Sequence, residues 1–75
     1  MSTDDPKLFA VRLSSRLRAL RLRQSDLARH LGINATTVSA WASGRNFARP
    51  PVMRKIADFL ETNIDYLYGT TDSPV

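Results

Sequence analysis

The chain has 75 residues and a net charge of +4, and it contains no cysteine. This length allows one small domain with an economical hydrophobic core, and the lack of cysteine excludes disulfides and thiolate metal sites. All eleven lysines and arginines lie between Lys7 and Lys55, where Asp26 is the only acidic residue. A basic middle between acidic ends favours a face that binds a polyanion. No apolar run approaches the roughly 20 residues needed to cross a bilayer, so we expect neither a membrane span nor a signal peptide.

The first predicted helix covers residues 7–22. Apolar residues recur along it at spacings of three and four and therefore share one stripe: Phe9, Leu13, Leu17 and Leu20. Residues 1–6 are expected to be disordered. Asp4 and Asp5 ahead of Pro6 nevertheless suit the start of a helix, because carboxylates are favourable at the positive end of the dipole and proline costs little in the first turn.

Two short helices are predicted next, at residues 24–31 and 35–43. Gly32 ends the first of them, since glycine adopts the left-handed conformation that other residues resist. Asn34 suits the N-cap of the second helix, because its side chain accepts from backbone N–H groups that lack an intrahelical partner. Gly44 ends the second helix.

The helix at residues 35–43 has an unusual outward face. Val38 and Trp41 are three residues apart and point inward, while the remaining residues of its first two turns are small: Ala35, Thr36, Thr37, Ser39 and Ala40. None of these is an arginine, lysine, glutamine or asparagine, so the bidentate pairs that read guanine or adenine are unavailable from the centre of the helix. If this helix reads DNA, we expect sparse direct contacts with a few thymine methyl groups. Further specificity would come from Asn34, Asn46 or Arg49 at the edges and from DNA shape between half-sites.

Two more helices complete the predicted fold. Pro50 or Pro51 fits the first turn of the fourth helix, because a first turn needs no N–H from these positions. Its inward face consists of apolar residues: Val52 or Met53, Ile56, Ala57 and Leu60. Asn63 caps a fifth helix at residues 64–68, and Gly69 ends it.

The stretch from Gln24 to Trp41 has the features of a helix-turn-helix. Ala28 permits close approach of the two helices, Gly32 makes the turn, and the second helix is narrow enough for a major groove. The chain resembles the phage repressor and Cro family of helix-turn-helix proteins, also called the Xre-like group, over residues 9–69. The matching residues extend along most of the chain: Phe9, Arg12, Leu13, Leu22, Gln24, Leu27, Ala28, Leu31, Gly32, Ile33, Val38, Ser39, Trp41, Gly44, Ile56, Ala57, Leu60, Ile64, Asp65, Tyr66, Leu67 and Gly69.

This resemblance implies a compact, all-α, five-helix fold of the lambda-repressor type. The DNA-binding domain would occupy residues 7–69, between the disordered segment at 1–6 and a flexible tail at 70–75. The residues facing base edges would be Ala35, Thr36, Ser39 and Ala40. The residues binding phosphates would be Arg23, Gln24, Asn34, Thr37, Ser43, Arg45, Asn46 and Arg49. Gln24 would stand at a helix N-terminus, where the dipole favours an anion.

The chain departs from the family pattern at three places. Arg23 stands where a serine or threonine often precedes the glutamine, so it is a poor cap but a candidate phosphate ligand. Ala48 replaces the usual proline four residues after the glycine. Leu17 and Ala42 occupy positions that commonly hold an arginine and a glutamate joined as an ion pair. Because both partners are apolar here, no lone buried charge is left, which supports the ungapped register of the first helix.

The function that the resemblance implies is transcriptional repression by a bacterial or phage-encoded, cytoplasmic protein. It would bind a palindromic operator in double-stranded DNA as a homodimer, with the helix at residues 35–43 in the major groove. The candidate dimer interface is an apolar end expected to be exposed: Phe59, Ile64, Tyr66 and Tyr68. An antitoxin or controller protein, which binds a protein partner as well as its own operator, is the alternative.

Other classes of function are disfavoured. A basic amphipathic membrane module would need an exposed apolar face, but the first helix commits its apolar stripe to the core. His30 is the only histidine, and the sequence offers it neither a nucleophile nor a metal partner. We therefore predict no enzymatic activity, no cofactor, no metal ion and no small-molecule ligand.

Overall fold

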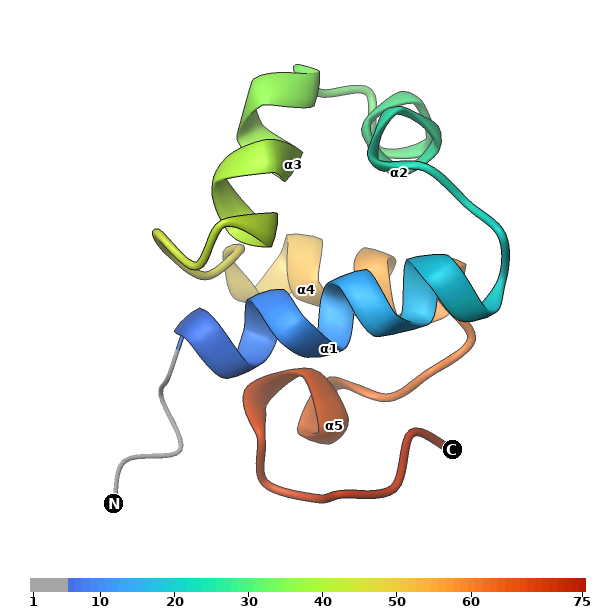
Figure 1. The fold of residues 1–75 in the computed structure, drawn as a ribbon, viewed down its shortest axis with the longest axis vertical. Helices are drawn as coiled ribbons and strands as arrows, with labels where there is room; N and C mark the ends of the chain where they lie inside the picture. Colours follow the sequence, from blue (N-terminus) through green and yellow to red (C-terminus); the bar gives the residue numbers. More distant parts are fainter. Residues whose placement is uncertain (1–5) are drawn as a thin grey trace.

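Five α-helices form the described part of the chain, residues 6–75, in the computed structural model (Figure 1). Their bounds are α1 Pro6–Ala19, α2 Gln24–Leu31, α3 Ala35–Ala42, α4 Pro50–Phe59 and α5 Ile64–Tyr68. The predicted all-α, five-helix class is confirmed. Pro6, which we expected to be disordered, is the first residue of α1. The rest of the predicted disordered segment, with Asp4 and Asp5, lies outside the described residues.

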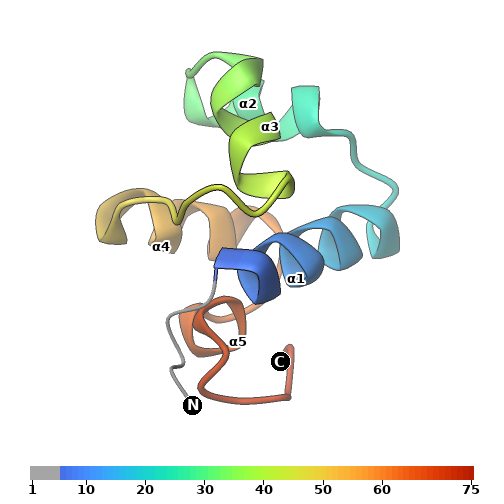
Figure 2. The same cartoon turned by 60° about the vertical axis from the view of Figure 1, so that its left-hand side comes forward.

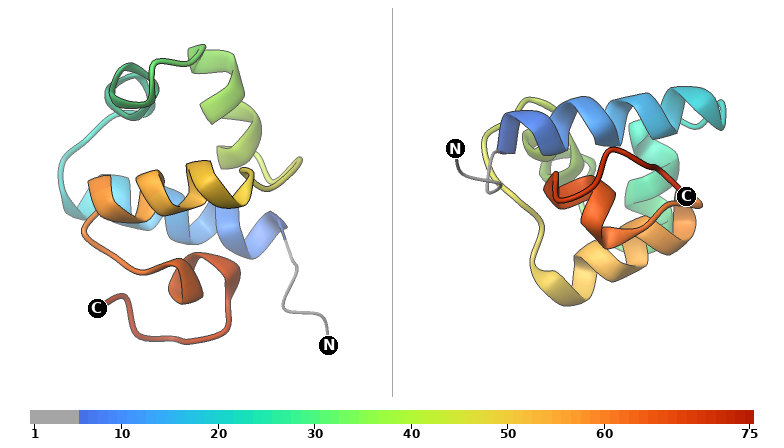
Figure 3. Two further views of the ribbon diagram at one scale, coloured as in Figure 1. Left: turned by 180° about the vertical axis from the view of Figure 1, so that it is seen from behind. Right: turned by 90° about the horizontal axis from the view of Figure 1, so that it is seen from below.

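The helices are arranged in three levels along the long axis of the molecule (Figures 1 and 3). α2 and α3 lie together at one end, α1 and α4 cross the middle, and α5 lies with the C-terminus at the other end. α1 packs against α3 and α5, and α4 packs against α2 and α5. The helix-turn-helix pair is therefore fixed to the rest of the domain by two longer helices.

One hydrophobic core receives side chains from all five helices. Its fully buried members are Phe9, Leu13, Leu27, Val38, Met53, Ile56, Leu60 and Leu67. Trp41 is buried as predicted, and its ring centroid lies 6.4 Å from that of Phe9. No polar or charged residue is buried among residues 6–75, so the burial of apolar surface dominates the stability of this core.

α1 ends earlier than predicted, at Ala19 instead of Leu22. Arg21 adopts a left-handed conformation with φ 58°, and the Leu22 N–H donates to the Leu17 carbonyl oxygen at 2.8 Å. This pattern closes the helix as a Schellman motif does. The turn lets both Leu20 and Leu22 pack against the core. A continuing helix could not achieve this, because residues two apart point to different faces.

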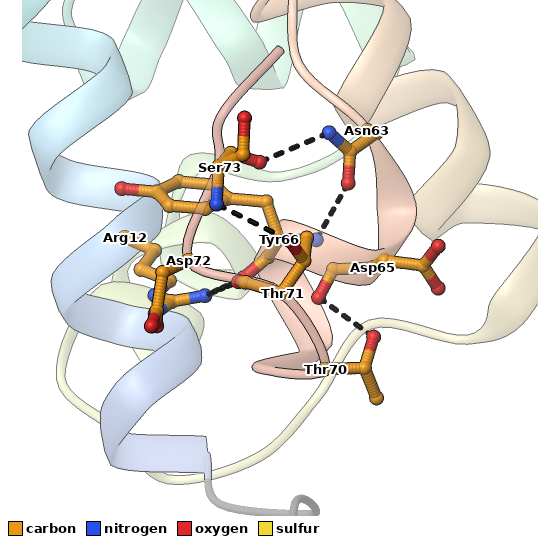
Figure 4. Close-up of polar contacts among 8 residues, drawn as sticks. All are labelled: Arg12, Asn63, Asp65, Tyr66, Thr70, Thr71, Asp72 and Ser73. Atoms are coloured by element: carbon orange, nitrogen blue, oxygen red, sulfur yellow. Dashed lines mark hydrogen bonds and ion pairs between the residues drawn. The ribbon is translucent and has the colours of Figure 1, made fainter.

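Residues 70–75, predicted to form a flexible tail, turn back past α5 in the structure (Figure 4). The Arg12 guanidinium donates to the carbonyl oxygens of Tyr66 and Thr71. It also pairs with the Asp72 carboxylate at 2.9 Å. A single side chain of α1 therefore holds both α5 and the segment that follows it.

The apolar residues expected to form an exposed end are half-buried instead: Phe59, Ile64, Tyr66 and Tyr68. The Phe59 ring stacks on His30 with centroids 4.3 Å apart, and the Tyr68 ring lies 5.6 Å from that of Phe47. The reason is the position of α5, which packs against both α1 and α4. The side chains of Ile64, Tyr66 and Tyr68 are therefore covered from two directions, while Phe59, at the end of α4, is covered by His30 of α2.

Candidate nucleic-acid interface

The turn between α2 and α3 places the start of α3 on the surface. Gly32 has φ 68°, and a Cβ added there would meet no atom within 4 Å, so the backbone conformation alone favours glycine. The Ile33 N–H donates to the Ala28 carbonyl oxygen at 3.0 Å and closes α2. Asn34 Oδ1 accepts from the Thr36 N–H at 3.3 Å, so the predicted N-cap of α3 is confirmed.

α3 turns an apolar face to the core and a face of small side chains to solvent. Figure 2 shows the course of this helix, which stands at the front of that view. Val38 and Trp41 are buried. The exposed residues are Ala35, Thr36, Thr37 and Ser39, and Ala40 is half-buried. The side chains of Thr36, Thr37 and Ser39 make no hydrogen bond within residues 6–75. A helix with such short, unengaged side chains can approach base edges closely.

The start of α2 presents Arg23 and Gln24, both exposed. The Arg23 N–H donates to Asp26 Oδ2 at 2.8 Å, which is the acidic half of a capping box. The Arg23 guanidinium has only donors and makes no cap, so it is free to bind elsewhere. The first N–H groups of a helix lack intrahelical acceptors and stand at the positive end of its dipole. This corner of the molecule can therefore bind an anion.

The segment between α3 and α4 is anchored by two apolar residues. Ala48 is buried, and the Phe47 ring lies 5.6 Å from the rings of both Phe9 and Tyr68. Alanine at position 48 thus anchors the segment where the family pattern has proline. Three predicted phosphate ligands on either side of these anchors are exposed: Arg45, Asn46 and Arg49.

Ser43 is a predicted phosphate ligand whose donors are already engaged. Its Oγ donates to the Ala40 carbonyl oxygen at 2.9 Å, and its N–H donates to the Ser39 carbonyl oxygen at 3.0 Å. A phosphate contact would require the hydroxyl to leave Ala40. Sequence reasoning missed this, because a serine at the end of a helix can bond back to its own backbone or outward.

A cleft of about 250 Å³ beside α3 joins two of the predicted ligands. Its lining is Ile33, Thr37, Trp41, Phe47, Ala48, Arg49 and Val52. Thr37 and Arg49 are brought together there, while Arg23 and Gln24 lie outside it. The predicted phosphate ligands therefore fall into at least two groups, one at the start of α2 and one around this cleft.

Leu17 and Ala42, which replace the arginine and glutamate of the family pattern, are consistent with the packing of α1 on α3. Leu17 is buried in the core, and Ala42 is half-buried at the end of α3. Since both side chains are apolar, neither helix contributes a buried charge at this contact. The register used in the sequence analysis places Leu13 and Leu17 inward, as they are observed.

Arg18 is an exposed cation that the sequence analysis did not assign to the interface. It lines a cleft of about 360 Å³ together with Gln24, and a second cleft of about 430 Å³ together with Ala42. The helical stripe indicates only that Arg18 points away from the core. Its proximity to the start of α2 depends on the left-handed turn at Arg21, for which the sequence carries no glycine signal.

Residues 6–75 lack the features of two other kinds of site. No group of three or more histidine, cysteine, aspartate or glutamate residues in this range could hold a metal ion. No helix in the same range combines the length and apolar character required to cross a membrane.

The fold and the surface of α3 define a helix-turn-helix protein. A sequence model of the family described as a helix-turn-helix domain matches residues 12–72, which is most of the chain. The chain belongs to this family of DNA-binding regulators, in agreement with its resemblance to the phage repressor and Cro group. Neither the curated proteins nor the solved structures contain a match to it.

Proposed function

We propose that this protein is a transcriptional repressor that binds a specific sequence in double-stranded DNA as a homodimer, with α3 in the major groove. The observation that carries the proposal is the exposed, uncharged face of α3, together with exposed cations at the start of α2 and in the segment after α3. In keeping with the resemblance, we propose a bacterial or phage-encoded protein that acts in the cytoplasm. The proposed activity is binding and not catalysis.

Phosphate contacts hold α3 in the groove in this proposal. Arg23 and Gln24 bind the backbone at the start of α2, and Arg45 and Arg49 bind it after α3. The remaining proposed phosphate ligands are Asn34, Thr37 and Asn46, with Ser43 joining them once its hydroxyl turns outward. Such contacts fix position and orientation on the duplex but carry no sequence information directly.

Base reading falls to the small side chains of α3. Ala35, Ala40 and the methyl group of Thr36 suit apolar contact with thymine methyls, while the hydroxyls of Thr36 and Ser39 can donate to or accept from either kind of base. Because these contacts are few, we propose that DNA shape between the half-sites adds to specificity.

We propose a dimer because one helix with such small side chains contacts too few base pairs to discriminate well between sequences. Two copies on half-sites about 10 base pairs apart would double the sequence that is read. We propose the α5 end as the contact between copies, through the solvent-facing parts of Ile64 and Tyr68. This end lies away from α3 along the long axis (Figure 1), so we propose that the copies touch side by side there, with their α3 ends facing the same duplex.

Selection of bound sequences from random duplex DNA tests the proposal. The purified chain should enrich a palindromic consensus whose half-sites are centred about one helical turn apart. A Thr36→Glu, Ser39→Glu variant should enrich nothing, because it places carboxylates against the bases, while its circular dichroism should match the wild type since both positions are exposed. No enrichment by the wild type would contradict DNA recognition, and a consensus without two-fold symmetry would contradict the dimer.

A further inference from the structure

Arg18 stands where two clefts meet beside the proposed DNA-binding elements. The first cleft, of about 360 Å³, is lined by Ser14, Leu17, Arg18, Leu22 and Gln24, and it joins α1 to the start of α2. The second, of about 430 Å³, is lined by Ala10, Val11, Ser14, Ser15, Arg18 and Ala42, and it joins α1 to the end of α3. Arg18 and Ser14 are the two residues that both linings share.

No counter-ion neutralises Arg18 within residues 6–75. Its side chain is exposed and makes no hydrogen bond or ion pair there, and neither cleft has an acidic residue in its lining. The nearest acid along the chain, Asp26, is engaged with the Arg23 N–H. The Arg18 guanidinium is therefore available to an anion from outside the chain.

Arg54 on α4 shows that exposure alone does not create such a site. It is also exposed and also lines a cleft, of about 260 Å³, but that lining includes Asp58 and Asp65. Two carboxylates in the same cleft repel an incoming phosphate. The two arginines thus share exposure and helical context but differ in the charges around them.

We propose that Arg18, assisted by the Ser14 hydroxyl, binds a phosphate of the DNA backbone and extends the contact surface from the start of α2 across α1. This inference rests on the proposed function. A guanidinium presents a planar fork of N–H groups that matches two phosphate oxygens, and a serine hydroxyl can donate to a third. A contact of this kind strengthens binding to every sequence alike and does not alter which sequence is preferred.

The salt dependence of binding to the selected duplex tests this contact. Arg18→Ala should reduce the log–log slope by about 0.9 per protomer, which corresponds to roughly five-fold weaker binding per protomer near 0.15 M salt. Arg54→Ala is the matched control and should keep the wild-type slope. The ratio of affinities for selected and scrambled duplexes should be the same in Arg18→Ala as in the wild type.

Neutral methylphosphonate linkages, introduced one position at a time, locate the contact. At least one position in each half-site should weaken binding by the wild type and have no effect on Arg18→Ala. A wild-type slope and an unchanged methylphosphonate profile in Arg18→Ala would overturn this inference alone. Failure of the wild type to bind any duplex specifically would overturn the proposed function, and this inference with it.

Discussion

At the scale of single residues, Arg12 links three parts of the chain through one guanidinium group. It donates to the Tyr66 carbonyl oxygen at 2.7 Å, to the Thr71 carbonyl oxygen, and to the Asp72 carboxylate. The guanidinium also lies 4.3 Å from the centre of the Tyr66 ring. The Arg12 side chain is only 12% exposed, so its removal would leave acceptors shielded from water. The carboxylate of Asp72 is fully exposed and contributes little.

Arg12→Gln should therefore lower the free energy of unfolding by about 2 kcal/mol, since hydrogen bonds to a charged group are lost and their acceptors stay partly covered. Asp72→Asn should have a much smaller effect. Urea denaturation measures both, with Arg29→Gln as the control because Arg29 is exposed and makes no side-chain hydrogen bond within residues 6–75. Equal stability of the Arg12→Gln and Arg29→Gln variants would contradict the linking role.

At the scale of elements, two helices end in the same way on residues that are not glycine. Arg21 follows α1 with φ 58°, and Glu61 follows α4 with φ 55°. After each, an N–H donates back to a carbonyl oxygen five residues earlier, at 2.8 Å from Leu22 and 2.9 Å from Thr62. A left-handed residue with a Cβ carries a conformational cost of roughly 1–2 kcal/mol, which glycine would remove.

Arg21→Gly should accordingly be more stable than Arg21→Ala by about 1 kcal/mol, because both remove the same charge and only glycine relieves the left-handed strain. Arg54 provides the comparison position, since it is exposed and lies inside α4, where the backbone is helical. There the glycine variant should be less stable than the alanine variant, by about 1 kcal/mol. Urea denaturation of the four variants measures both differences, and an alanine at position 21 that equals or exceeds glycine would show that the turn is not strained.

Sequence patterns predicted an element closely where the residues next to it signal its ends, and poorly where they do not. The bounds of α2, α3 and α5 follow from residues next to them, because Gly32, Asn34, Asn63 and Gly69 adopt the cap conformations expected of their types. The end of α1 was mispredicted, because Arg21 is not a residue that signals a left-handed turn. Contacts between Arg12 and the segment after α5 join residues about 60 positions apart, which no local pattern reveals.

The candidate site also has some features that the sequence predicts and others that it does not. The small outward face of α3 could be predicted, because helical periodicity alone separates Val38 and Trp41 from their neighbours. The engagement of the Ser43 hydroxyl and the position of Arg18 beside Gln24 could not, because each depends on how a turn is made and how α1 packs. Tertiary geometry therefore decides which polar residues near α3 are available.

At the scale of the whole molecule, most of the described acidic residues lie in one part of the sequence. The described acidic residues other than Asp26 all follow α3 in the sequence and belong to α4, α5 or the segments after them: Asp58, Glu61, Asp65 and Asp72. α5 and the C-terminus lie at the end opposite α2 and α3 (Figure 1). The acidic residues on α5 and after it therefore disfavour the approach of a polyanion through the α5 end.

The central claim is that α3 reads a specific DNA sequence, and its most direct test compares two duplexes of identical length and base composition. Affinities for the selected duplex and for its scrambled counterpart are measured at the same salt concentration, so the phosphate contribution is common to both. The account predicts at least about 1,000-fold tighter binding to the selected duplex. It also predicts a smaller ratio for Thr36→Ala, Ser39→Ala, whose exposed positions leave the fold intact. Equal affinity of the wild type for both duplexes would contradict the claim.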